Sequence, residues 1–94
     1  MEKIDLAALK NAKSYSVEYP DYENIITKDF LKKFRKDNDL TQLRLACILN
    51  VSKKTIEKWE QGVNPIKGTS AVLIYLLSNN PELITELYKE ERNY

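Results

Sequence analysis

From Thr27 onward, the sequence consists of short stretches in which apolar residues recur at the spacing of an amphipathic helix. Turn and cap residues separate these stretches, and no alternation typical of strands interrupts them. Isolated helices shorter than about 12 residues are marginal in water, so such stretches must bury their apolar faces against one another. The sequence therefore predicts an all-α domain of five helices.

Cap residues predict where the first three helices begin and end. Thr27, Thr41 and Ser52 each precede an apolar stripe, where an N-cap side chain is favoured. Gly62 follows the third stripe, where a residue that tolerates positive φ ends a helix. The residues expected to face the core are Phe30, Leu31, Phe34, Leu45, Ala46, Leu49, Ile56 and Trp59.

Two further helices are predicted after Pro65. Thr69 or Ser70 is expected to cap the fourth helix, and Asn80 is expected to cap the fifth, with Pro81 at its first position. The fourth helix should bury the stripe Val72, Leu73, Leu76 and Leu77. The fifth should present the apolar face Leu83, Ile84, Leu87 and Tyr88.

The N-terminal stretch has a different pattern. Tyr15, Val17 and Tyr19 alternate with polar residues, as in a short strand or an extended segment, and Pro20 then ends the alternation. We predict that residues 1–24 form an N-terminal arm, extended or partly ordered, and that residues 25–94 form the helical domain.

The composition argues against most catalytic classes. Histidine is absent, which removes the commonest general base and metal ligand. The lone Cys47 cannot form an internal disulfide or a cysteine zinc site, and two glycines do not make a phosphate-binding loop. The longest apolar run is far shorter than the roughly 20 residues of a membrane span, and no signal peptide is evident. We therefore expect a cytoplasmic protein that is not an enzyme and binds no metal, cofactor or membrane.

The charge is unevenly distributed along the chain. Residues 27–67 carry ten Lys and Arg against five Asp and Glu, whereas the segments 1–26 and 68–94 are each net acidic by two charges. A basic centre between acidic flanks suits a polyanionic partner, although a solvated lysine-rich surface would give the same count.

The segment Leu40–Gly62 holds two short helices joined by a three-residue turn. Ala46 is small where the second helix must cross the first closely, and Val51 and Ile56 are placed to fill the turn and the core. Asn50 stands where the tight turn needs left-handed backbone geometry. Together with Thr41–Gln42 and Trp59–Glu60, this pattern resembles the lambda-repressor-like helix-turn-helix of the Xre/Cro family of DNA-binding proteins.

The resemblance implies which residues contact DNA. Gln42, which opens the second helix, matches the position that donates to a backbone phosphate. Lys53 and Lys54 match the first exposed positions of the recognition helix, which read base edges in the major groove, and Lys58 lies on the same face. Gln42 could instead be an exposed polar helix residue, and Lys53 and Lys54 could instead contact backbone phosphates.

Three other residues of the recognition helix have competing interpretations. Glu57 either accepts from a cytosine amino group or pairs with Lys53 or Lys54, and we favour the pairing. Thr55 either contacts the groove or packs, and Ser52 is a better candidate for a cap than for a base contact. The resemblance also places Arg35 against Glu60 as a partly buried ion pair that holds the recognition helix; two separate surface charges are the alternative.

The C-terminal part, with Gly62–Gly68 and Asn80–Ile84, resembles antitoxins related to HigA and MqsA. The resemblance implies a homodimer formed through the helices after the motif, and an arm that contacts a basic toxin of the RelE-like RNase type. The zinc-binding domain of the MqsA type has no counterpart here. The predicted function is thus an operator-binding repressor that acts as a type II antitoxin. A free-standing phage or host repressor without a toxin is the alternative. A small nuclease would need a carboxylate cluster or a lysine-based site, and the acidic residues here are scattered over helix surfaces and caps.

Overall fold

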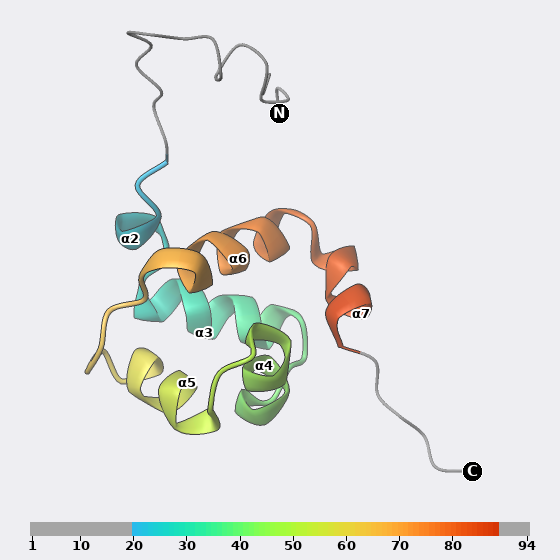
Figure 1. Cartoon of the computed structure of the whole chain (residues 1–94), viewed down its shortest axis with the longest axis horizontal. Coiled ribbons are helices and arrows are strands. Elements are labelled where there is room, and N and C mark those ends of the chain that lie inside the picture. Colours follow the sequence, from blue (N-terminus) through green and yellow to red (C-terminus); the bar gives the residue numbers. More distant parts are fainter. Residues whose placement is uncertain (1–19, 89–94) are drawn as a thin grey trace, which may run out of the picture.

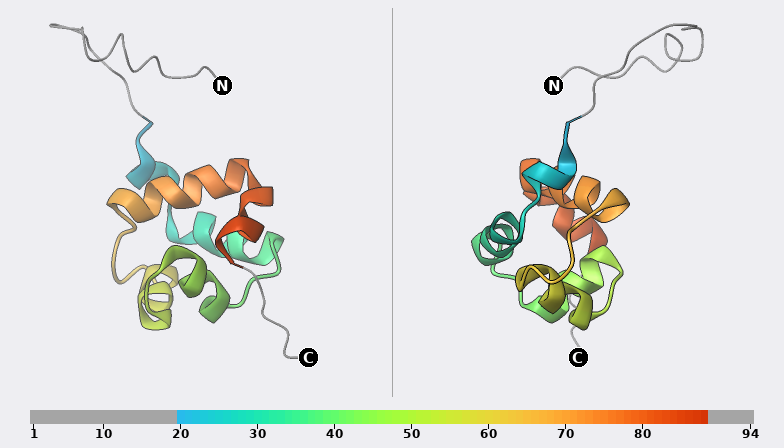
Figure 2. Two further views of the ribbon diagram at one scale, coloured as in Figure 1. Left: turned by 45° about the vertical axis from the view of Figure 1, so that its right-hand side comes forward. Right: turned by 90° about the vertical axis from the view of Figure 1, so that its left-hand side faces the viewer.

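The computed structural model describes residues 20–88, and every regular element in this part of the chain is a helix. In order, the elements are α2 (Tyr22–Ile25), α3 (Lys28–Asp37), α4 (Gln42–Leu49), α5 (Lys53–Glu60), α6 (Gly68–Asn79), the 3₁₀ helix η1 (Pro81–Leu83) and α7 (Ile84–Leu87). Figures 1 and 2 show α6 along one end of the domain and α4 with α5 at the other end, with α3 between them. The predicted all-α fold is confirmed.

The predicted caps of the three central helices are present. The hydroxyl oxygens of Thr27, Thr41 and Ser52 accept hydrogen bonds from the backbone N–H groups three residues later, at 3.2, 3.1 and 3.1 Å. Asn50 ends α4 with φ 55° and ψ 46°, the left-handed geometry expected of it. Gly62 follows α5 with φ 76°.

The core lies where the helices meet. Leu31 of α3, Leu45 of α4 and Ile56 of α5 are fully buried, as the helical spacing predicts. Ala46 is 2% exposed, and the N–H of Val51 donates to its carbonyl at 3.0 Å, so the turn folds directly back over this small residue. Phe34, Leu49 and Trp59 are buried as predicted, whereas Phe30 is only partly buried and packs against this core.

Helix α6 differs from the prediction in its start and in its inner face. It begins at Gly68, with Lys67 as its N-cap residue, so the cap predicted at Thr69 or Ser70 is wrong. Ala71, Ile74 and Leu77 are buried, whereas Val72 and Leu76 of the predicted stripe are each 42% exposed. Residues 71–77 are all apolar, so helical spacing alone could not show which side faces inward.

The C-terminal helix also differs. The Asn80 side chain does not cap the helix that follows; its Nδ2 group donates to the carbonyl of Leu76 at 2.9 Å and so ends α6. Pro81 begins a 3₁₀ turn that leads into the four-residue α7. Ile84 and Tyr88 pack against the core, but Leu83 and Leu87 are 36% and 49% exposed.

The short helix α2 was not predicted from the sequence. The edge of Tyr22 packs on Tyr75 of α6, with ring centroids 5.2 Å apart, and Ile26 just after α2 is 1% exposed. The predicted boundary between residues 24 and 25 therefore falls inside an element that packs on the domain. Tyr15, Val17 and Tyr19 lie outside the described residues. No helix within residues 20–88 has the length and apolar character needed to cross a bilayer.

Candidate nucleic-acid interface

Helices α4 and α5, joined through residues 50–52, form the helix-turn-helix. Ile56, Trp59 and Glu60 on the inner side of α5 are buried, whereas Lys53 and Lys54 at its N-terminal end are exposed. Figure 1 shows α5 at the margin of the domain, away from α6. The helix thus presents its first turn to solvent while its inner side fixes it to the core.

The lysines of α5 differ in their partners. Lys53 Nζ lies 3.6 Å from Glu57 Oε1, one helical turn away. Glu57 therefore pairs with a lysine, which is the interpretation that we favoured. An exposed pair of this kind contributes no more than about 1 kcal/mol, and it can open at small cost. Within residues 20–88, Lys54 and Lys58 belong to no ion pair.

Ser52 and Thr55 are joined at the start of α5. Besides accepting from the Thr55 N–H, the Ser52 hydroxyl lies 2.9 Å from the Thr55 hydroxyl. This geometry fits the cap expected at Ser52. It also holds Thr55, which is half-buried, next to the lysines of the first turn.

Arg35 and Glu60 form a bidentate ion pair between α3 and α5. Arg35 Nε donates to Glu60 Oε2 at 2.7 Å, and Arg35 Nη2 donates to Glu60 Oε1 at 2.9 Å. The third nitrogen, Nη1, donates to the carbonyl of Leu40 at 3.1 Å. The hydrogen bonds to Glu60 raise the pKa of Arg35 above its ordinary value, with desolvation acting in the opposite direction. The side chains are only 18% and 7% exposed, so little solvent screens the pair.

Gln42 takes part in the same cluster, which sequence reasoning missed. Its Nε2 group donates to Glu60 Oε1 at 3.4 Å, although Gln42 is predicted to donate to phosphate. The two residues are 18 positions apart, so no local pattern could have indicated the contact. Glu60 therefore connects the first residue of α4 with α3 and α5. Among residues 20–88, no group of three His, Cys, Asp or Glu side chains could hold a metal ion.

Comparison with known proteins agrees with this geometry. Residues 31–74 match the helix-turn-helix family model, a span that includes α4, the turn and α5. This part of the chain is therefore similar to helix-turn-helix domains, and the arrangement of α4, the turn and α5 agrees with that similarity. It is also 27% identical over 62 residues to antitoxin HigA-2 of Vibrio cholerae serotype O1, across 66% of this chain. The chain spans 60% of the length of that relative.

Proposed function

We propose that this protein is a sequence-specific operator-binding repressor that acts as the antitoxin of a type II toxin–antitoxin pair, represses its own operon and neutralises a RelE-like RNase toxin. The observation that carries the DNA-binding part is the exposed first turn of α5, which the Arg35–Glu60 pair fixes to α3. In this docking mode the N-terminal residues of the recognition helix reach the base edges of the major groove.

The free charges of α5 suggest a division of roles. Lys54 is the leading candidate for a base contact, because it is exposed at the start of the helix and no ion pair has to break before it can reach DNA. Lys53 must leave Glu57 before it can reach DNA, which suits a phosphate contact better. Lys58 lies four residues after Lys54 and is placed to follow the same groove face.

Gln42 is the proposed backbone contact. An amide group has two N–H donors, and Glu60 accepts from only one of them. The other N–H of Gln42 remains for a phosphate beside the start of α4, where backbone N–H groups also favour an anion. Glu60 would then orient Gln42 rather than compete with DNA for it.

The outer face of the C-terminal helices supports a homodimer. Val72 and Leu76 lie four residues apart on α6 and are both exposed, as are Leu83 and Leu87. A helix that is apolar on all sides is normally buried, so we propose that a second copy covers this face. Dimerisation would place two α5 helices on half-sites about 34 Å apart.

The proposed toxin partner rests on the similarity to an antitoxin and on the charge of the arm. Residues 1–26 carry five Asp and Glu against three Lys, so they complement a basic protein. The basic excess lies in residues 27–67, which keeps the proposed toxin and DNA surfaces apart. Because a repressor must share a compartment with its operator, we propose that the protein acts in the cytoplasm.

Footprinting on the DNA upstream of the gene tests the repressor. We expect two protected half-sites about one helical turn apart, and protection of a single half-site at every protein concentration would contradict the dimer. Co-expression with the neighbouring gene tests the toxin. A basic protein that co-purifies supports the antitoxin, whereas its absence, with operator binding intact, would favour the free-standing repressor.

A further inference from the structure

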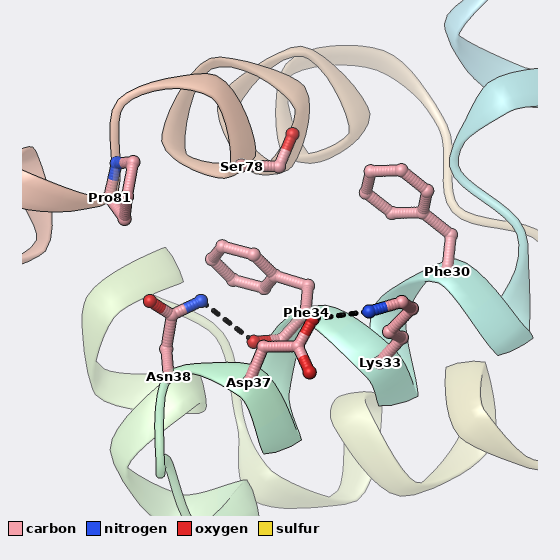
Figure 3. Close-up of a pocket in the computed structure, with 7 residues that line it drawn as sticks. All are labelled: Phe30, Lys33, Phe34, Asp37, Asn38, Ser78 and Pro81. Carbon is pink, nitrogen blue, oxygen red and sulfur yellow. Dashed lines mark hydrogen bonds and ion pairs between the residues drawn. The ribbon is translucent and has the colours of Figure 1, made fainter.

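A groove lies between α3 and the C-terminal end of α6, apart from the proposed DNA contacts. It has a volume of about 400 Å³ and is lined by Phe30, Lys33, Phe34, Asp37, Asn38, Ser78 and Pro81. Figure 3 shows both phenylalanine rings pointing from α3 toward α6, with Ser78 and Pro81 on the opposite wall. Lys33 and Asp37 pair with each other at the rim of the groove. Arg35, which lies between them in the sequence, pairs with Glu60 of α5 instead.

The groove is chemically suited to a tyrosine side chain. Its volume falls within the range of about 300–1,000 Å³ that is usual for ligand pockets. The two phenylalanine rings can stack edge to face with a third aromatic ring. At the rim, Asn38 uses its Nδ2 group to bind the carbonyl of Phe34, and Ser78 donates to the carbonyl of Tyr75. Their oxygens remain as acceptors for a phenolic hydroxyl.

The N-terminal segment enters the domain next to this groove. Tyr22 packs on Tyr75, which lies three residues before Ser78 on the same side of α6. The N–H of Tyr22 donates to Pro20 at 3.0 Å, so the chain arrives at this point from Tyr19. Tyr75 and Ser78 are about one helical turn apart on α6, a rise of only about 5.4 Å. Five extended residues span up to about 18 Å, so Tyr15 and Tyr19 are both close enough in the sequence to reach the groove.

We propose that the segment Tyr15–Tyr19 docks along this groove and inserts a tyrosine ring between α3 and α6. The C-terminal segment 89–94 suits the groove less well, because four of its six residues are charged. A second copy suits it less well too, because a stable dimer needs about 800 Å² from each partner, far more than a groove for one side chain offers.

Nuclear Overhauser contacts in the full-length protein test this proposal. We expect contacts between the ring protons of Tyr15 or Tyr19 and those of Phe30 and Phe34. In the Tyr15→Ser/Tyr19→Ser double variant, the Phe30 and Phe34 resonances should shift, while the backbone amides of α4 and α5 keep their positions. The matched control, Tyr94→Ser, removes an aromatic ring from the other end of the chain and should leave the groove resonances unchanged.

Three results would overturn the proposal. One is the absence of tyrosine–phenylalanine contacts together with unchanged groove resonances in the double variant. Another is a groove shift in Tyr94→Ser, which would assign the groove to the C-terminal segment. The third is a change in the Phe30 and Phe34 resonances of the wild-type protein on tenfold dilution, which would show that a second copy occupies the groove. Operator affinity is measured separately, so none of these results would bear on DNA binding.

Discussion

Gln42 on α4 donates to Glu60 on α5 at 3.4 Å, through the same carboxylate oxygen that accepts from Arg35 Nη2. One carboxylate therefore ties together the support helix α3 and both helices of the helix-turn-helix. A buried carboxylate without partners is costly, so all three helices are expected to depend on the Arg35–Glu60 pair for their relative positions.

Replacing Arg35 should destabilise the domain strongly. Arg35→Ala leaves the Glu60 carboxylate buried with only the longer bond from Gln42, and we expect a loss of about 3–5 kcal/mol in the free energy of unfolding. Urea denaturation measures it. The matched control, Lys33→Ala, breaks an ion pair whose side chains are 77% and 58% exposed, and should cost less than about 1 kcal/mol. Equal losses in the two variants would show that burial of the pair has no energetic consequence.

Enlarging Ala46 should disturb the crossing of α4 and α5. Ala46→Leu adds volume at a residue that is 2% exposed, directly beneath the turn. Overpacking of this kind costs about 1–3 kcal/mol, which should appear as a lower melting temperature. Cys47→Leu is the control, because Cys47 is exposed on the same helix. A wild-type melting temperature for Ala46→Leu would contradict the close packing of α4 and α5 at this residue.

The turn residue Asn50 can be tested in both directions. With φ 55°, Asn50→Val should be destabilised by about 1–2 kcal/mol, because left-handed geometry brings the Cβ atom too close to the following carbonyl. Asn50→Gly has no Cβ atom and should equal or exceed the wild type in stability. The reverse order of the two variants in thermal denaturation would contradict the backbone geometry at this turn.

Charging the outer face of α6 should separate the copies without unfolding them. Val72→Glu/Leu76→Glu alters two side chains that are each 42% exposed, so the helical circular dichroism should be retained. Analytical ultracentrifugation should show a dimer for the wild type and a monomer for the variant. Glu82→Gln is a control on an exposed residue nearby. A variant that remains dimeric would move the interface to another surface.

The parts of the fold that follow from local chemistry could be predicted from the sequence. Thr27, Thr41 and Ser52 act as caps through bonds that span three residues, and Asn50 occupies a turn that few residue types tolerate. The positions of Arg35 and Glu60 followed from the resemblance to a known motif, and the structure shows how closely the two side chains meet.

The parts that depend on tertiary packing could not be predicted. Helix α2 has only four residues and depends on packing against α6, so no periodic pattern indicates it. The run 71–77 is apolar throughout, so its orientation is decided by neighbours rather than by its own sequence. The Asn80 side chain binds the carbonyl of Leu76 and makes no cap hydrogen bond to the 3₁₀ turn at Pro81, so the expected cap does not form. The Gln42–Glu60 contact joins residues that only the fold brings together.

The central claim, that the first turn of α5 reads the operator, is tested most directly by measuring discrimination between operator and random DNA. Fluorescence anisotropy should show that Lys53→Ala/Lys54→Ala loses this discrimination, because the loss of the Lys54 base contact alone costs about 1–3 kcal/mol. Lys33→Ala removes one positive charge from the flank of α3 and should keep the wild-type ratio of affinities. Unchanged discrimination in the double variant, with the fold intact, would contradict the assignment of α5 as the recognition helix.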